Sequence, residues 1–285
     1  MQRILIPTDF SEMAQNAVNY GVELARRAGA RITIMHSVQK PLVPPQGPVR
    51  DLSDIPQEDD ASIALWQELE GITNWIREGR PEIEKVSQRM PSGLPGDEIL
   101  KNVEEEQVDL VVMGTKGEKG FGDTLMGTTA ANVLQKASCD VLLIPEEARF
   151  NKYEQVAYAT GLNEKDPRAL KKLFRFLEDD PKARVDAVHV LGKGEGLNEK
   201  HYEAFEKGLE KEGLSEKVTF EKLEGDHLEE VLDWFIQHKG VDLLAMLNES
   251  RNFFQRLFHN SKSKKMAFHT KVPLLVIHAE SELRD

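Results

Sequence analysis

The sequence predicts an α/β protein in which strands joined through helices form parallel sheets with helices on both faces. Two observations carry this prediction. Short runs of Val, Ile and Leu alternate along the chain with longer segments whose apolar residues recur at helical spacing. The same order of runs then occurs a second time, in a chain of 285 residues that is long enough for about two domains. We therefore expect a tandem duplication.

The first half opens with a strand, a helix and a second strand. The run "RILIPT" at residues 3–8 predicts the first strand. A helix is expected at residues 11–29, because Ser11 can cap its start and Gly29 can end it in a left-handed turn. The run "ARITIMHSV" at residues 30–38 predicts the second strand.

A proline-rich segment at residues 41–60 predicts a long loop. Apolar residues then return at helical spacing and predict a helix with one buried stripe, formed by Ile63, Trp66, Leu69, Ile72 and Ile76. Residues 83–90 are typical of a strand, and residues 95–107 of a helix.

The first half closes with a buried strand at residues 108–114, a helix at 123–137 and a last strand at 139–145. Cys139, the single cysteine of the chain, lies beside the last apolar run, so we interpret it as a small core residue. Glycines are frequent between the fourth strand and the helix, at positions 114, 117, 120, 122 and 127.

The second half repeats this order. Strands are expected at residues 155–161, 184–192, 217–225, 241–247 and 272–278. Helices are expected at residues 166–180, 198–212, 227–240 and near 253–268.

The repeat extends to the residues themselves. The run "EEEQVDLVVMG" pairs with "IQHKGVDLLAML", and an ungapped register from there places "CDVLLIP" over "VPLLVIH". His36 likewise lies over His189. We therefore predict one domain at residues 1–147 and a second at residues 148–285.

Composition excludes some function classes. The net charge of −12 argues against general nucleic-acid binding, which needs a cationic surface, and against binding to anionic membranes. No run of about 18 apolar residues predicts a spanning helix, and the N-terminus has no signal-like apolar segment. A single cysteine suits a reducing compartment, so we expect a cytoplasmic protein.

The glycine-rich stretch is a candidate ligand site. In an open parallel sheet, ligands bind beyond the carboxyl ends of the strands, here "PTDFS", "HSV" and "MGTKG". Glycines let main-chain N–H groups turn toward phosphate oxygens, and the following helix offers its positive end together with the hydroxyls of Thr128 and Thr129. Lys116 adds charge, and Asp9 can accept a hydrogen bond from a ribose hydroxyl. The alternative is a turn that merely joins a strand to a helix, since the Walker pattern is absent.

The spacing Gly114-x2-Gly117-x9-Gly127-Thr128 resembles the ATP-binding signature of the universal stress protein family. "PTDFS" and "DLVVMGTKG" resemble two further motifs of that family, so the whole chain resembles a tandem universal stress protein. The resemblance implies a doubled, five-stranded, Rossmann-like domain of the adenine nucleotide alpha hydrolase type. It implies ATP or another adenine nucleotide, with or without Mg²⁺. It also implies binding residues at Thr8, Asp9, Ser37, Met113, Gly114, Lys116, Gly117, Gly127, Thr128 and Thr129. Asp9 is expected at the ribose, the main chain near Ser37 at the adenine, and the glycines and threonines at the phosphates.

The second copy departs from this signature. The register replaces the three signature glycines by Leu247, Ser250 and Asn260, and the first strands align Asp9 with Gly161. Side chains at these positions obstruct a main-chain cradle, so we predict that the second domain does not bind ATP in the same way. Residues 250–271 carry six Lys and Arg residues and no acid, which indicates either a docking patch or a solvated helix face.

We therefore expect a stress-response protein that binds ATP in its first domain and acts as a regulatory or interaction module. The alternatives are an interaction protein with a vestigial site, and a slow ATPase. No catalytic residue or metal site is expected, and His36 and His189 are interpreted as structural. The two apolar last strands are expected to pair within the chain as a pseudo-dimer. Association of two chains into a homodimer stays open, as does the identity of a protein partner.

Overall fold

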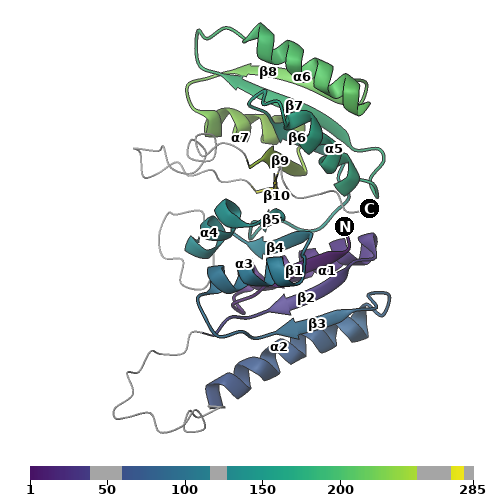
Figure 1. Cartoon of the computed structure of the whole chain (residues 1–285), viewed down its shortest axis with the longest axis vertical. Helices are drawn as coiled ribbons and strands as arrows, with labels where there is room; N and C mark the ends of the chain where they lie inside the picture. Colours follow the sequence, from purple (N-terminus) through teal and green to yellow (C-terminus); the bar gives the residue numbers. More distant parts are fainter. Residues whose placement is uncertain (39–59, 116–126, 249–270, 279–285) are drawn as a thin grey trace.

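The computed structural model describes residues 1–38, 60–115, 127–248 and 271–278. Ten strands form one continuous sheet along the long axis of the molecule, in the order β3-β2-β1-β4-β5-β10-β9-β6-β7-β8 (Figure 1). The predicted α/β class is confirmed, with both halves contributing to the same sheet. The loop expected at 41–60, the helix expected near 253–268 and nearly all of the basic segment lie outside the described residues.

The strands lie close to the positions that the apolar runs predict. Their bounds are β1 Arg3–Pro7, β2 Arg31–Met35, β3 Val86–Arg89, β4 Leu110–Gly114, β5 Asp140–Ile144, β6 Gln155–Ala159, β7 Arg184–Leu191, β8 Val218–Glu224, β9 Leu243–Leu247 and β10 Leu274–Ile277. The helices are α1 Glu12–Ala28, α2 Asp60–Gly79, α3 Pro95–Glu105, α4 Thr128–Lys136, α5 Asp166–Phe176, α6 Glu199–Glu212 and α7 Leu228–Lys239. No helix of the described residues is long and apolar enough to cross a membrane.

Helices cover both faces of the sheet, and each face has one apolar core that both halves share. Helices α1, α2, α5 and α6 pack on one face, and their core includes Ile4, Leu69 and Tyr158. Helices α3, α4 and α7 pack on the other face, around residues such as Leu5 and Val276. Apolar burial therefore joins the halves on both sides of the sheet.

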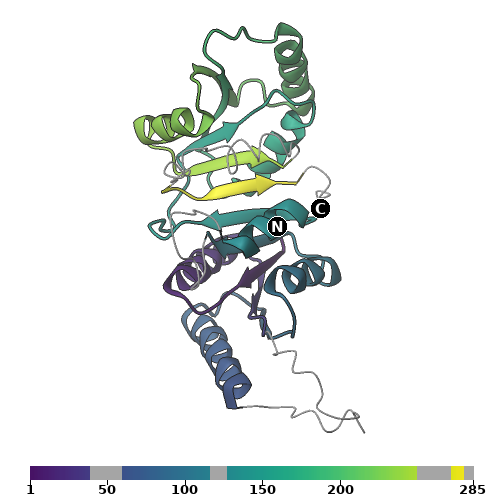
Figure 2. The same cartoon turned by 90° about the vertical axis from the view of Figure 1, so that its left-hand side faces the viewer.

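The two last strands form the seam between the halves, as predicted. Strand β10 pairs with β5 in the antiparallel sense, with Leu275 opposite Leu142, whereas every other pair of neighbouring strands is parallel (Figure 2). The strands of the two halves therefore run in opposite directions. The carboxyl ends of β1 and β4 lie on one side of the sheet, and those of β6 and β9 on the opposite side.

Local sequence signals explain helix α1. Ser11 lies in extended backbone and its Oγ accepts a hydrogen bond from the N–H of Ala14, as an N-cap does. Gly29 ends the helix at φ 60°, a conformation that a side chain disfavours. Both predicted caps are confirmed.

Helix α2 corrects one expectation. Leu69 and Ile76 of its predicted stripe are fully buried, but Ile63 and Trp66 are each 40% exposed. The reason is length, because a helix of 20 residues is about 30 Å long, whereas a four-residue strand such as β3 spans about 13 Å. The first turns of α2 therefore extend past the sheet (Figure 1).

Candidate functional site

The order of the strands reverses between β1 and β4, because β2 lies beside β1 on one side and β4 on the other. Crevices at such reversals, beyond the carboxyl ends of the strands, are the usual ligand sites of open parallel sheets. Thr8 and Asp9 follow β1 directly, and Gly114 is the last residue of β4. The topology thus brings the two predicted motifs side by side at the same edge of the sheet, where such a crevice is expected.

A tight turn holds Asp9 at the end of β1. The Oδ1 atom of Asp9 accepts hydrogen bonds from the N–H and the Oγ of Ser11, at 3.2 and 2.6 Å. Thr8 is 7% exposed, and its Oγ1 accepts from the N–H of Phe10 at 3.0 Å. Phe10 has φ 64°, which is unusual for a bulky residue, and this conformation turns the chain from the strand into α1.

The end of β2 supports this turn. The Nδ1 atom of His36 lies 2.8 Å from the carbonyl oxygen of Thr8, and its ring lies 4.5 Å from that of Phe10. A carbonyl only accepts, so Nδ1 carries the proton, and His36 has the structural role that we expected. The Oγ of Ser37 donates to the carbonyl of Gly93 at 2.8 Å. A ligand near Ser37 would therefore meet main-chain atoms, as the resemblance implies.

The start of α4 returns to the end of β4. The N–H of Gly127 donates to the carbonyl of Thr115 at 2.7 Å. Gly127 is the N-cap of α4 and provides no side-chain cap, so the first N–H groups of the helix, from Thr128 onward, have no helical carbonyl to bind. Thr128 is exposed and Thr129 is half-buried. Within the described residues the positive end of α4 has no side-chain cap and suits an anion, while the N–H of Gly127 itself is engaged.

Of the three other predicted residues, one faces the core and two lie outside the described residues. The side chain of Met113 is 6% exposed and belongs to the core below α3 and α4, so a ligand at the strand end would meet its main chain. Lys116 and Gly117 lie outside the described residues. Thr115 was not among the predicted residues, although it lies between Gly114 and Lys116 in the motif and its carbonyl holds the N–H of Gly127.

The second half repeats the turn of the first. Thr160 follows β6 as Thr8 follows β1, and its Oγ1 accepts from the N–H of Leu162 at 2.9 Å. Leu162 has φ 58°, close to that of Phe10. His189 Nδ1 lies 2.9 Å from the carbonyl oxygen of Thr160. These contacts confirm the alignment of Thr8 with Thr160 and of His36 with His189.

A buried carboxylate occupies the turn of the second half. Asp166 is 1% exposed and accepts hydrogen bonds from Tyr158 Oη at 2.7 Å and Thr160 Oγ1 at 2.5 Å. It also accepts from the N–H of Asn163 at 2.8 Å. Gly161 stands where the first half has Asp9, and a Cβ built on it meets open space. The carboxylate of this half therefore stabilises the turn from within and does not face a ligand.

The end of β9 also differs from that of β4. Leu247 and Asn248 stand in the places of Gly114 and Thr115, since Asn248 N–H binds the carbonyl of Ile277 as Thr115 N–H binds that of Ile144. The side-chain amide of Asn248 donates to the carbonyl of Leu134 in α4, at 2.7 Å. A cavity of about 490 Å³ at this point is lined by Gly161, Leu162, Lys165, His201 and Leu247 among others. Because β9 ends in Leu247, where β4 ends in Gly114, this cavity differs chemically from the site at β1 and β4.

Comparison with known proteins decides the family. The model of the universal stress protein family matches the chain twice, at residues 1–145 and 152–278. The chain belongs to the universal stress protein family. Universal stress protein MJ0531 of Methanocaldococcus jannaschii is 29% identical over 146 residues, which are 50% of this chain and 81% of that protein. Universal stress protein YxiE of Bacillus subtilis is 26% identical over 145 residues, 50% of this chain and 97% of its own.

A solved structure has the same architecture over the whole length. The crystal structure of a universal stress protein from Archaeoglobus fulgidus superposes with a TM-score of 0.68 and 19% identity, covering 97% of this chain and 98% of that one. At this identity the likeness shows the fold. These two curated relatives each match about half of this universal stress protein, in agreement with the double match of the family model.

Proposed function

We propose that this universal stress protein binds ATP or a related adenine nucleotide in the crevice between β1 and β4, and acts as a nucleotide-dependent regulatory or interaction module. The observation that carries the proposal is the meeting of Asp9, Gly114 and the uncapped start of α4 at the strand reversal. A carboxylate suits a ribose hydroxyl, and a helix N-terminus suits phosphate. When bound, the nucleotide supplies a phosphate chain that Mg²⁺ can accompany.

The roles of the residues follow from their contacts. Asp9 is held by Ser11 and is the residue for the ribose, whereas the first-turn N–H groups and hydroxyls of Thr128 and Thr129 are the donors for phosphate. Gly127 contributes differently, because its N–H binds Thr115. Its role is to let the phosphates approach the main chain, which a β-carbon would prevent.

We propose that only the domain at residues 1–147 binds the nucleotide in this way. The domain at residues 148–285 has Gly161 and Leu247 where the first has Asp9 and Gly114, and its nearby carboxylate, Asp166, is buried in hydrogen bonds.

Native mass spectrometry of the full chain with ATP and Mg²⁺ tests the proposal. We expect one adenine nucleotide per chain. Asp9→Ala removes the ribose acceptor and Gly127→Val obstructs the phosphate approach, so each should weaken binding about tenfold or more. The matched control is Gly161→Ala, at the place of Asp9 in the second half, where the added methyl meets open space and affinity should not change.

Other outcomes contradict defined parts of the proposal. Two nucleotides per chain would show that the second domain also binds. No nucleotide even at high ATP would leave the glycines as turn residues and favour the interaction protein with a vestigial site. Turnover of ATP that Asp9→Ala abolishes would favour the slow ATPase.

A further inference from the structure

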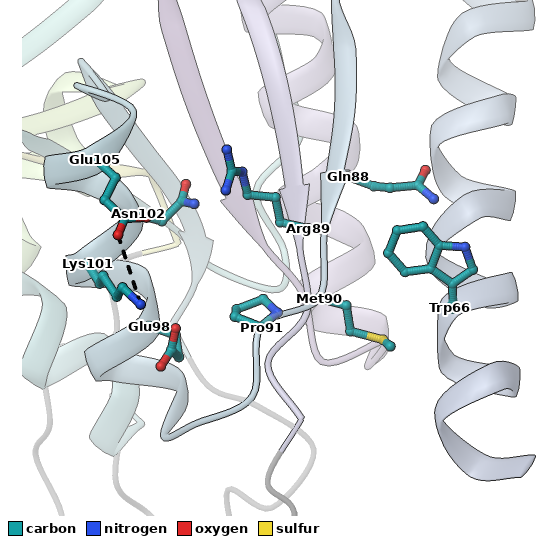
Figure 3. A pocket seen from close by; sticks show the side chains of 9 residues that line it. All are labelled: Trp66, Gln88, Arg89, Met90, Pro91, Glu98, Lys101, Asn102 and Glu105. Carbon is teal, nitrogen blue, oxygen red and sulfur yellow. Dashed lines mark ion pairs between the residues drawn. The ribbon is translucent and has the colours of Figure 1, made fainter. Parts of the chain in front are cut away.

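A cavity of about 360 Å³ lies at the outer edge of the sheet, and none of the predicted nucleotide-binding residues lines it (Figure 3). It surrounds the end of β3, the first strand in the sheet order. Figure 3 shows α3 on one side of β3 and Trp66 of α2 on the other. The cavity therefore has two walls of different origin, with the strand edge between them.

The edge of β3 has main-chain groups that β2 does not use. The carbonyls of Lys85 and Arg89 accept hydrogen bonds from Ile32 of β2 and from His36 just after it, at 2.9 and 3.0 Å. Because successive residues of a strand face opposite sides, the main-chain groups of Gln88 and Met90 point away from β2, where the described sheet has no further strand. Such an edge is a template for another extended chain.

The same alternation assigns each side chain of β3 to one wall. Gln88 faces α2, since its Oε1 accepts from Thr73 Oγ1 at 2.5 Å. Arg89 faces α3, where it pairs with Glu106. A chain added along β3 would present its side chains to the two walls in the same alternating way.

The wall from α2 is apolar. Trp66, a residue that is 40% exposed, lines the cavity, and Met90 lies across from it in Figure 3. A large exposed aromatic ring beside a cavity is typical of a contact for an apolar side chain.

The wall from α3 is polar, with an unmet acceptor. Asn102 is only 5% exposed, and its Oδ1 has no hydrogen-bond partner among the residues that the structure describes. Glu98 lies one helical turn before Asn102 on the same wall. Lys101 pairs with Glu105 at 3.9 Å. The two cations that also line the cavity, Arg89 and Lys101, are paired with Glu106 and Glu105. Glu98 and Asn102 are therefore the acceptors of this wall for a group that carries positive charge and several N–H donors, such as a guanidinium.

We propose that the edge of β3 binds an extended peptide segment in which apolar residues alternate with arginines. The peptide pairs with the main chain of Gln88 and Met90 as an additional strand. Its apolar side chains contact Trp66, and its arginines contact Glu98 and Asn102. This mode of recognition takes affinity from the main chain and specificity from alternate side chains.

The test uses the full chain and two fluorescein-labelled peptides of the same composition. In one, valine and arginine alternate; in the other, all arginines stand at one end. Since the protein is acidic, the second peptide measures plain charge attraction. By fluorescence anisotropy at physiological salt, we expect the alternating peptide to bind about tenfold more tightly.

Three variants locate the site. Trp66→Ala should weaken the alternating peptide about tenfold, whereas Trp75→Ala, which removes another exposed indole of α2 that does not line the cavity, should change it less than about twofold. Gln88→Pro removes an outward N–H without removing a bond to β2 and should also weaken binding. Glu98→Lys should weaken binding of the alternating peptide, whose arginines contact Glu98. Equal affinity for the two peptides, no binding of either, or equal effects of the two tryptophan variants would overturn the proposal.

Discussion

His278 lies at the junction of the halves and shows how a single residue couples the seam to pH. Its Nε2 is 3.2 Å from the carbonyl oxygen of Leu134 in α4, and its N–H donates to Asp140 Oδ1 at 2.9 Å. Lys172 Nζ binds both Asp140 Oδ1 and the carbonyl of His278. Burial lowers the pKa of the His278 imidazole, more than the nearby Asp140 carboxylate raises it.

This lowered pKa predicts that the protein loses stability in weak acid. The unfolded chain takes up a proton on His278 near pH of about 6.5, while the folded chain resists protonation, so the free energy of unfolding falls as the pH drops below that value. Urea unfolding over a pH series measures the slope. His278→Asn should flatten it, because the variant lacks the imidazole whose pKa burial lowers. Equal slopes in wild type and His278→Asn would contradict the prediction.

At the scale of elements, helices α2 and α6 each contain an internal glycine, but the space around the two glycines differs. Gly71 lies inside α2, and a Cβ built there meets nothing within 4 Å. Gly208 lies inside α6, where a Cβ would be 2.4 Å from Cγ of Pro167 in α5. Proline is a rigid ring, so the two helices would have to separate.

The same substitution should therefore have opposite effects in the two helices. Gly71→Ala should raise the free energy of unfolding by up to about 1 kcal/mol, because alanine favours helix. Gly208→Ala should lower it by about 1–2 kcal/mol, since overpacking at the α5–α6 contact outweighs that gain. Chemical denaturation of the two variants measures both signs. A stabilising Gly208→Ala would show that α5 moves freely.

What the sequence can predict follows the range of the interaction involved. Helix α1 was predictable because Ser11 and Gly29 act locally. The exposure of Trp66 was not, because it depends on the shortness of β3, a neighbour distant in the sequence. At the site, the positions of the glycines and threonines could be predicted from the sequence, but the hydrogen bond from Gly127 N–H to the carbonyl of Thr115 could not. The positive φ of Phe10 has no sequence signal, since bulky residues rarely adopt it.

At the scale of the whole molecule, the seam makes the two halves one structural unit. Leu275 of β10 is 1% exposed and pairs with Leu142 of β5. The hydroxyls of Tyr20 in α1 and Tyr153 before β6 lie 2.8 Å apart, joining the halves on one face. Both apolar cores extend across the seam. Unfolding of one half should therefore expose core residues of the other.

We expect Leu275→Ala to destabilise both halves together. Removal of a fully buried leucine should lower the free energy of unfolding by about 2–5 kcal/mol. Hydrogen exchange should accelerate in β4 and β5 as well as in β9. Leu94→Ala, at a leucine that is 61% exposed, is the control and should change stability by less than about 0.5 kcal/mol. Faster exchange confined to the second half would show that the halves unfold separately.

The presence of both halves in one polypeptide also has an evolutionary consequence. In a symmetric dimer of identical chains, every substitution occurs twice, so both crevices must change together. Here the antiparallel pairing of β5 with β10 lies within one polypeptide, and a substitution occurs once. The two sites can therefore diverge in sequence while the pairing of β5 with β10 is retained. The end of β9 can therefore carry Leu247 where that of β4 carries Gly114, because each position is under separate selection.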